Sequence, residues 1–380
     1  MSSQDISFSA VRKKLTIAGA SLLTGALLIG GVLIAPTGAG AASSGSIPAA
    51  TKKYNQLKIR PTKIPVTTPI QGKIPTGKTI DWVVCGVPGC TVLTKPLTQA
   101  AAALGWKVVS IPGGLQPETI LNAWNLAVQN KPDGVVGTGF PESIFSSAVQ
   151  QLNAAKTPAI SAFVTDTPGP SSGLAAVVNG EPSYTHAGTA LADIVLGAQG
   201  KSANAVFLGG TTFPASQFEE KAFDKEYKSL CSSCVTSSIE EPATLTGDAL
   251  TSSIVADLTR NPSINWVVAS QPNDVYGLPA ALKTAGLSKV KILVNTPDAT
   301  TVNYLKQGQI AGINVVPNTD NMAEIVDAFA RTYTGQSVAP DETAGGDWAA
   351  MTPAAAKQIK APYYLVPGYL AQYKKLWKSS

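Results

Sequence analysis

The residues with the clearest capacity for chemistry are four cysteines, which form two closely spaced pairs. They are Cys85, Cys90, Cys231 and Cys234. Four cysteines allow three pairings, of which the two local ones are the simplest. A redox role for the second pair would need a thiolate at a helix start, whereas this pair follows a charged helical stretch and precedes a strand. We therefore expect structural disulfides or free thiols, with redox chemistry and a zinc site as minor alternatives.

Residue types that support catalysis are sparse. The chain has one histidine, His186, so no Ser-His-Asp set is apparent. His186 lies early in a predicted helix with no cysteine or acid at metal-ligand spacing, which predicts no metal site. A carboxylate pair of the glycosidase kind stays open from the sequence. We expect a protein that is not an enzyme and that needs neither cofactor nor metal.

A strand–helix–strand unit from Asp81 to Pro112 organises the predicted fold. Trp82–Cys85 is an apolar run typical of a buried strand, and apolar residues then recur at helical spacing up to Gly105, where a second strand follows. In an open parallel sheet, ligands bind beyond the carboxyl ends of the strands. The loop Gly86–Thr91 is therefore the first candidate ligand-binding loop, with Thr91 as a candidate contact.

From Asp81 onward, predicted strands and helices alternate, and the pattern restarts near Gly180. Such alternation predicts an α/β protein with two doubly wound parallel-sheet lobes. The expected lobes are 79–180 with 317–350, and 181–316 with 351–380. Three crossings between them are expected near Asn179–Pro182, Asn314–Pro317 and Gly345–Pro353. A cleft between two such lobes is a preferred ligand site.

The N-terminus has the three parts of an export signal. Three basic residues from Arg12 to Lys14 precede an uncharged apolar run, Leu15–Ala35, and small residues at 39–41 form a cleavage site. The run is also just long enough to span a bilayer, so a retained membrane anchor is the alternative. We expect residues 1–41 to direct an extracytoplasmic protein, either secreted or anchored at the cell surface.

Residues 42–78 are rich in proline and lysine, and no apolar period is apparent in them. This composition predicts an extended, solvated linker. The chain has a net charge of +5, but residues 1–41 contribute +2 and residues 42–80 contribute +7, which leaves −4 on the remainder. Because the predicted folded part is mildly acidic, the alkaline isoelectric point is no sign of nucleic acid binding.

Several stretches taken together resemble exported solute-binding proteins of the ribose- and sugar-binding type. Their order and spacing, more than any one of them, carries the likeness, which covers about residues 79–335. The matching stretches are Asn130–Val136, Lys156–Ile160, Asn261–Val268, Gln271–Gly286 and Tyr304–Gly312 followed by Pro317. The resemblance implies the type I periplasmic binding protein fold, in which two lobes close on one solute.

Site residues follow from this resemblance. Asn273 and Asp274 match a position that contacts solute hydroxyls in the family, although both are also good helix N-caps. Gln217 falls where sugar binders often carry Arg, Phe163-Val164 falls where they often carry an Asp-Arg pair, and Asn295 lies near a usual Asp. Without the Asp-Arg pair, the solute is expected to be less hydroxylated or more amphipathic than a sugar. Phe140 and Phe163 are candidates to stack on its apolar face.

The resemblance implies binding of a small solute and its delivery to an ABC-type membrane permease. The alternative function is a ligand-sensing partner of a membrane receptor with the same fold. We expect a monomer that binds no nucleic acid.

Overall fold

The computed structural model describes residues 45–380 except 211–212, 242–246, 343–348, 362 and 378–380. The chain divides into residues 1–41 and residues 42–380, and every described residue belongs to the second unit. The export signal or anchor expected over 1–41 lies outside the described residues. In the part that is described, no helix is both long and apolar enough to cross a membrane.

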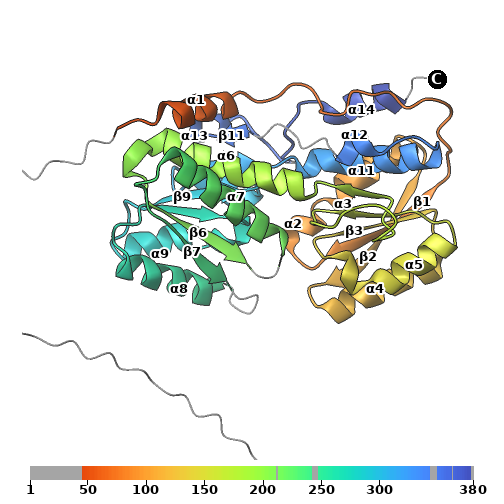
Figure 1. Ribbon diagram of the computed structural model, residues 1–380, viewed down its shortest axis with the longest axis horizontal. Coiled ribbons are helices and arrows are strands. Elements are labelled where there is room, and N and C mark those ends of the chain that lie inside the picture. The colour runs from red at the N-terminus through yellow and green to blue at the C-terminus, as the bar shows by residue number, and fades with distance from the viewer. Residues whose placement is uncertain (1–44, 211–212, 242–246, 343–348, 362, 378–380) are drawn as a thin grey trace, which may run out of the picture. The chain divides into compact units, whose positions relative to one another are not determined.

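The first lobe is built on a parallel sheet with strand order β2-β1-β3-β4-β5. The strands are β1 (Thr79–Cys85), β2 (Lys107–Gly114), β3 (Gly134–Thr138), β4 (Ala159–Ala162) and β5 (Ala176–Val178). Helices α3 (Thr94–Ala102) and α11 (Asn318–Tyr333) cover one face, and α4 (Pro117–Asn130) and α5 (Ser146–Ala154) cover the other (Figure 1). Because side chains alternate along a strand, Trp82 packs into the first of these layers and Val83 into the second.

The second lobe has strand order β11-β10-β9-β8-β6-β7, parallel except for β11. Its strands are β6 (Ala205–Gly210), β7 (Thr236–Glu241), β8 (Trp266–Ala269), β9 (Lys291–Asn295), β10 (Gly312–Val315) and β11 (Ala349–Met351). One face carries α6 (Glu181–Gln199) and α7 (Ala215–Leu230). The other carries α8 (Gly247–Arg260), α9 (Leu278–Thr284) and α10 (Ala299–Lys306).

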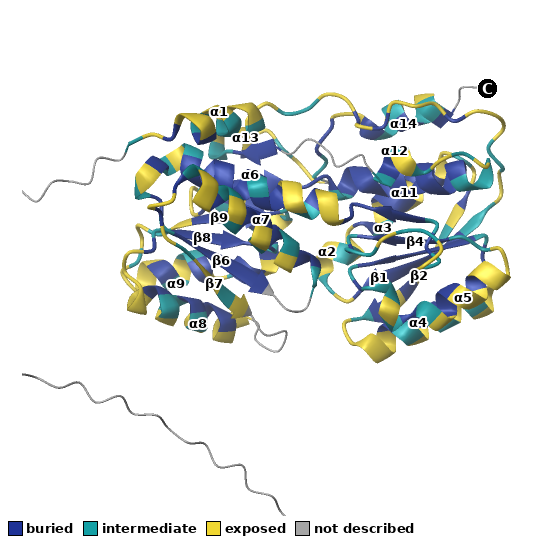
Figure 2. Ribbon diagram, in the orientation of Figure 1, coloured by how far each residue is buried: buried dark blue, intermediate teal, exposed yellow. Residues whose placement is uncertain are grey.

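Shorter helices complete the two lobes. They are α2 (Pro88–Thr91), η1 (Glu142–Ile144), η2 (Gly200–Ser202), η3 (Pro272–Val275), α12 (Ala339–Glu342) and α13 (Pro353–Ala356). The inner strands of both sheets are buried on both faces, the edge strands β2 and β7 are partly exposed, and the outer sides of the helices are exposed (Figure 2). This is the burial that near-continuous apolar strands and amphipathic helices predict, so the expected doubly wound α/β fold is confirmed.

The segment expected to be a solvated linker is instead packed from residue 45 onward. Residues Pro48–Leu57 form α1, which lies on α6 with Ala50 fully buried. Beyond α1, the buried residues Ile64, Val66 and Ile70 join the apolar core. Prolines separate these apolar residues, so no helical or strand period was visible in the sequence, although each side chain finds a buried site.

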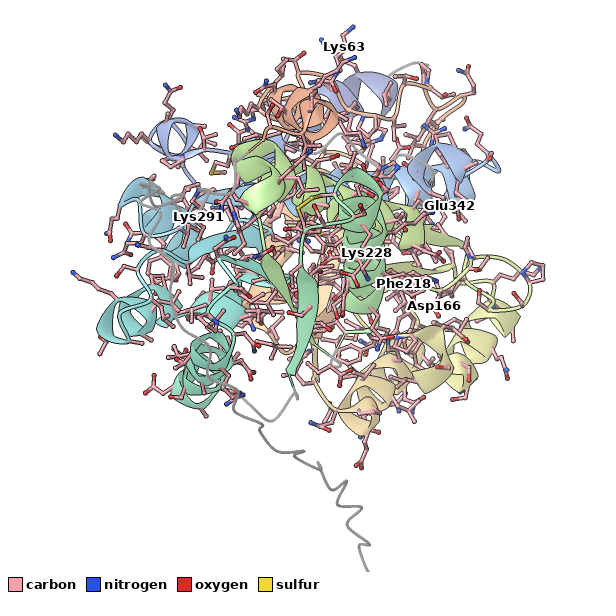
Figure 3. All side chains as sticks on the ribbon, turned by 60° about the vertical axis from the view of Figure 1, so that its left-hand side comes forward. Lys63, Asp166, Phe218, Lys228, Lys291 and Glu342 are labelled. Carbon is pink, nitrogen blue, oxygen red and sulfur yellow. A yellow bond between two sulfur atoms is a disulfide. The ribbon has the colours of Figure 1, made fainter. Side chains whose placement is uncertain are left out.

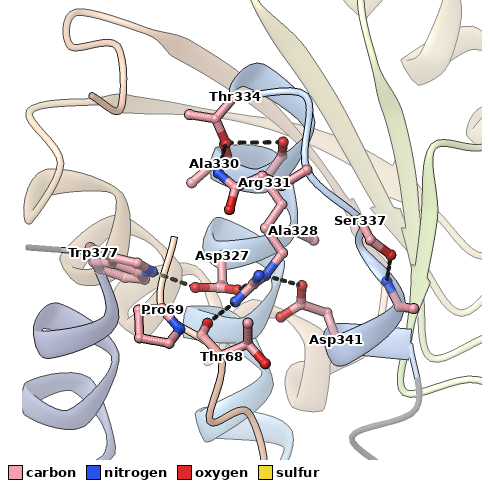
Figure 4. A network of polar contacts seen from close by, with 12 residues as sticks. Thr68, Pro69, Asp327, Ala328, Ala330, Arg331, Thr334, Ser337, Asp341 and Trp377 are labelled. Carbon is pink, nitrogen blue, oxygen red and sulfur yellow. Dashed lines mark hydrogen bonds and ion pairs between the residues drawn. The ribbon is translucent and has the colours of Figure 1, made fainter. Parts of the chain in front are cut away.

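The C-terminal helix also differs from the expectation, which assigned 351–380 to the second lobe. In the structure β11 pairs with β10 and α13 contacts α10, but α14 (Tyr369–Trp377) packs on α11 of the first lobe. A buried polar network ties it there (Figure 4). The Trp377 indole donates to Asp327 at 2.6 Å, and Asp327 and Asp341 both contact the Arg331 guanidinium.

The chain consequently passes between the lobes more often than the three expected crossings. Asn179–Pro182 and Asn314–Pro317 connect the two sheets as expected, whereas the third expected crossing includes residues outside the described part. Two further passages lie between α1 and Ile64 and between α13 and α14. They are joined to each other, because Arg60 donates to the carbonyls of Leu365 and Tyr364 at 2.7 and 2.6 Å.

Candidate functional site

A pocket of about 450 Å³ lies at the carboxyl ends of strands from both sheets. Residues that end or follow a strand line it: Thr138, Phe163, Asn179, Gln271, Asn295 and Val316. Parallel strands place their carboxyl ends at the same edge of a sheet, which is where ligands bind in folds of this kind. The volume is within the range of small-molecule sites.

The backbone is strained where several strands enter the pocket. Phe163, Asn179 and Thr296 follow β4, β5 and β9 with φ of 60°, 57° and 68°. This left-handed region is unfavourable for a bulky residue and most of all for a β-branched one such as Thr296. All three line the pocket. Strain of this kind clusters at functional sites, so it supports the identification of the pocket as a binding site.

The loop after β1 forms one wall. Both local disulfides are present, and Cys85–Cys90 ties the end of β1 to α2. Pro88, Cys90 and Val92 line the pocket, whereas Thr91 is exposed and is not among the lining residues. The predicted loop therefore reaches the pocket through the neighbours of Thr91.

Glu219 is a buried acidic residue in the pocket lining, and sequence reasoning missed it. It is 1 % exposed. Its Oε1 accepts from the Asn295 amide at 2.7 Å and its Oε2 from the Ser270 hydroxyl at 2.5 Å. Burial raises the pKa of Glu219 to about 8 against these two hydrogen bonds, which lower it, and the nearby Asp274 raises it further.

The packing of α7 on α6 holds Glu219 in place. A Cβ built at Gly188 of α6 would lie 2.1 Å from the backbone oxygen of Glu219, so only glycine allows this approach. The signal in the sequence is helical spacing, because Ala215, Glu219 and Phe223 recur every four residues on the buried face of α7. An acid on an apolar helix face has to be paired or functional.

Asn295 continues the polar network behind the pocket. It donates to Glu219 and accepts from the Asn314 amide at 2.9 Å. Asn295 lines the pocket, so the structure brings this candidate together with Phe163 and Asn273. That any of the three contacts a solute stays a prediction.

The other candidates are placed differently. Asp274 is buried and caps η3: its carboxylate accepts from the Gln271 backbone at 2.9 Å and from the Asn273 amide at 2.8 Å, and burial raises its pKa to about 7. Phe140 is buried, 5.8 Å between ring centroids from Phe213, which itself lines the pocket. Gln217 is exposed on α7 and is not a lining residue.

Aromatic hydroxyls add to the lining. Tyr184, Tyr276 and Tyr363 contribute rings beside Phe163 and Phe213. The Tyr276 hydroxyl donates to Asp298, and burial raises the tyrosine pKa well above its usual value. Asp298 also caps α10 by accepting from the Thr301 backbone at 2.7 Å. Sequence reasoning did not select these tyrosines, because they come from segments far apart in the chain.

The ionisable side chains of the lining are acids and tyrosines. Its described residues include two acidic side chains, Glu219 and Asp298, and no lysine, arginine or histidine. Lysines such as Lys63, Lys228 and Lys291 are exposed on the outside of the lobes (Figure 3). Among the residues the structure describes, no group of three or more His, Cys, Asp or Glu is arranged to hold a metal ion.

From the sequence we expected neither a phosphate loop nor a nucleophile elbow, but two stretches do have the spacing of these motifs. Gly72–Thr79 has the Gly-x-x-x-x-Gly-Lys-Thr spacing of a phosphate loop, but it leads into β1 and Lys78 pairs with Asp133 at 2.8 Å. Gly169–Gly173 has the Gly-x-Ser-x-Gly spacing, but it is a turn between β4 and β5 with no helix after it. Neither is in the structural context its motif requires.

Comparison with known families identifies the chain over most of its length. Residues 88–337 match the family model described as a periplasmic binding protein domain. A comparison with curated protein sequences found no match.

Solved structures are similar in fold. An ABC transporter periplasmic solute binding protein from Actinobacillus succinogenes with bound D-allose has a TM-score of 0.65 at 17% identity over 74% of this chain and 100% of that chain. The glucose-galactose binding protein GanP from Geobacillus stearothermophilus has a TM-score of 0.63 at 20% identity over 76% and 100%. A periplasmic ribose ABC transporter from Conexibacter woesei has 0.62 at 13% over 76% and 96%. At such identities the likeness concerns the fold.

Proposed function

We propose that this chain, which belongs to the periplasmic binding protein domain family, binds one small polar solute outside the cytoplasm and delivers it to an ABC-type permease. The observation that carries the proposal is the pocket itself. It joins strand-end amides and a buried carboxylate to aromatic rings within about 450 Å³. Few convergent polar groups in a largely apolar, preformed cavity are typical of a small-molecule site.

The chemistry of the lining supports a sugar-like or amphipathic solute. Rings such as Phe163 and Phe213 offer flat apolar surfaces, and Asn273 and Asn295 offer donors and acceptors for hydroxyl groups. Two of the similar structures are described by the sugars they bind, D-allose in one and glucose and galactose in the other. The described lining has no arginine to fork onto adjacent hydroxyls, which favours a solute with an apolar face.

The remaining parts of the proposal follow from the same site. Binding needs no cofactor, metal or turnover, so we propose no enzymatic activity. We propose that the protein acts as a monomer and binds no nucleic acid. Delivery to a permease and signalling to a membrane receptor would share the binding step and differ in the membrane partner.

A thermal-shift screen of the purified chain, as its host processes it, tests the binding step. The panel contains sugars, polyols, amino acids and small aromatic compounds. A solute at one hundred times its dissociation constant should add about 2.7 kcal/mol to the free energy of unfolding. Failure of every compound to raise the melting temperature would contradict the proposal.

Variants then locate the binding site. Asn273→Ala, at an exposed lining residue, should weaken binding by about 1 kcal/mol, or roughly fivefold in Kd, because a hydrogen bond to the solute is lost. The matched control is Asn303→Ala, at an exposed residue of α10 outside the lining, which should leave the Kd unchanged. Gln217→Ala tests the choice of Gln217 as a ligand residue, which rests on the resemblance. Because Gln217 is exposed and outside the lining, we expect no change in Kd. Equal losses in Asn273→Ala and Asn303→Ala would contradict this site.

A further inference from the structure

The described lining of the pocket has acidic side chains and no basic one. Glu219 and Asp298 line it, and the described lining residues include no cationic side chain. The charge of Asp298 is already engaged, because it accepts from the Tyr276 hydroxyl and from the backbone and hydroxyl of Thr301. Among the described residues, neither a basic group nor a helix end engages Glu219 in this way.

Within the part of the chain that the structure describes, Glu219 accepts from two neutral groups, the Asn295 amide and the Ser270 hydroxyl. The titratable groups that face it from neighbouring elements are Asp274 on η3 and Tyr184 on α6, and neither supplies positive charge. An ionised buried carboxylate without a counter-charge is costly, so a cation is the partner that this position lacks.

The aromatic lining of the pocket suits an organic cation. Rings of Phe163, Tyr184, Phe213, Tyr276 and Tyr363 line the same pocket. Aromatic faces attract ammonium groups, and they do so more strongly where water is excluded. A neutral sugar needs donors and acceptors at several hydroxyls, whereas an ammonium group needs the combination of carboxylate and rings present here.

Resting on the proposed function, we propose that the solute carries a protonated amine and that ionised Glu219 binds this ammonium group. The pocket thus selects an amine-bearing polar solute over the corresponding neutral alcohol.

Binding of this kind is coupled to a proton. The pKa of Glu219, raised to about 8 by burial, keeps the carboxyl protonated in the empty pocket at pH 7. An ammonium group favours the ionised form, so its arrival displaces the carboxyl proton to solvent. About one proton should leave per amine bound, and Kd should rise about tenfold for each pH unit below 8.

The experiment uses two matched pairs of probes on the purified chain. They are D-glucosamine with D-glucose, and 1-amino-1-deoxy-D-glucitol with D-glucitol. Titration calorimetry in two buffers of different ionisation enthalpy measures both the Kd and the protons released. We expect at least one amine to bind about tenfold or more tightly than its alcohol, with proton release.

Glu219→Gln imitates the protonated carboxyl without the ability to ionise, and its melting temperature reports whether it folds. It should lose amine binding by at least about tenfold and abolish proton release. The matched control is Glu220→Gln, the neighbouring acid on α7 outside the lining, which should retain both.

The remaining outcomes separate the two proposals. Equal affinity for amine and alcohol, absence of proton release, or amine binding that survives Glu219→Gln would overturn the amine assignment and leave the solute-binding function standing. If neither these probes nor any compound of the wider panel binds, both proposals fail.

Discussion

Single residues at the strand ends form much of the pocket lining, and one of them, Thr296, has a strained backbone conformation. Its φ of 68° is unusual for a β-branched residue, and its backbone N–H donates to the Asn314 carbonyl at 2.9 Å. A left-handed conformation costs about 1–3 kcal/mol at a non-glycine residue. This hydrogen bond helps to hold the backbone there.

Replacing Thr296 by glycine should relieve this strain. We expect Thr296→Gly to be about 1 kcal/mol more stable, after the larger unfolded-state entropy of glycine is subtracted from the strain. Thr300→Gly is the control, since Thr300 also lines the pocket but lies in the first turn of α10, where glycine should cost up to about 1 kcal/mol. Urea unfolding measures both, and a loss of stability in Thr296→Gly equal to that in Thr300→Gly would refute the strain argument.

At this scale the sequence predicts where a strand ends better than which way a side chain points. Phe163, Asn273 and Asn295 were selected and line the pocket, whereas Phe140 and Asp274 turn into the protein. Position after a strand is a local property and can be recognised in the sequence. The orientation depends on partners such as Phe213, which come from the other lobe.

Among the elements, α11 has the largest share of buried polar groups. Its Arg331 donates to the Thr68 carbonyl at 2.6 Å, and its Asp320 accepts from the backbone of Leu365 and Val366 at 2.9 and 2.8 Å. One helix thus fixes both the N-terminal segment and the approach to α14. The alternation of strands and helices was predictable because it is periodic along the chain. These contacts span more than 250 residues to Thr68, so no local pattern indicated them.

Removal of the Trp377 indole donor in α14 should show how much its hydrogen bond to α11 contributes to the stability of the protein. Trp377→Phe leaves the Asp327 carboxylate with one fewer hydrogen bond in a buried place, because the indole donates at 2.6 Å. Trp106→Phe is the control: it removes a similar volume and a 2.6 Å bond, but the acceptor is the neutral Pro75 carbonyl. Hydrogen bonds to charged groups stabilise a protein more than hydrogen bonds to neutral groups. In urea unfolding, Trp377→Phe should therefore lose about 1 kcal/mol more stability than Trp106→Phe. Equal losses would show that the charge on Asp327 adds nothing.

For the whole molecule, buried carboxyls set the dependence of stability on pH. Burial raises the pKa of Glu219 and Glu324 to about 8, and that of Asp193 and Asp320 to about 7. The same side chains ionise near pH 4 in the unfolded chain. Between about pH 4 and 8 the folded state therefore holds more protons than the unfolded state, so the free energy of unfolding falls as pH rises.

The unliganded protein should accordingly be more stable at pH 5 than at pH 8, and the loss should level off above pH 8. Each such carboxyl contributes up to about 1.4 kcal/mol per pH unit within this window. Glu324→Gln, which keeps the shape of the protonated group beside Asp320, Asp327 and Asp341, should flatten the slope by up to that amount. Glu118→Gln, at an exposed residue of α4, should not change it. Urea unfolding at pH 5, 6.5 and 8 decides the matter, because stability that rises over this range would mean that these buried acids are ionised in the folded state.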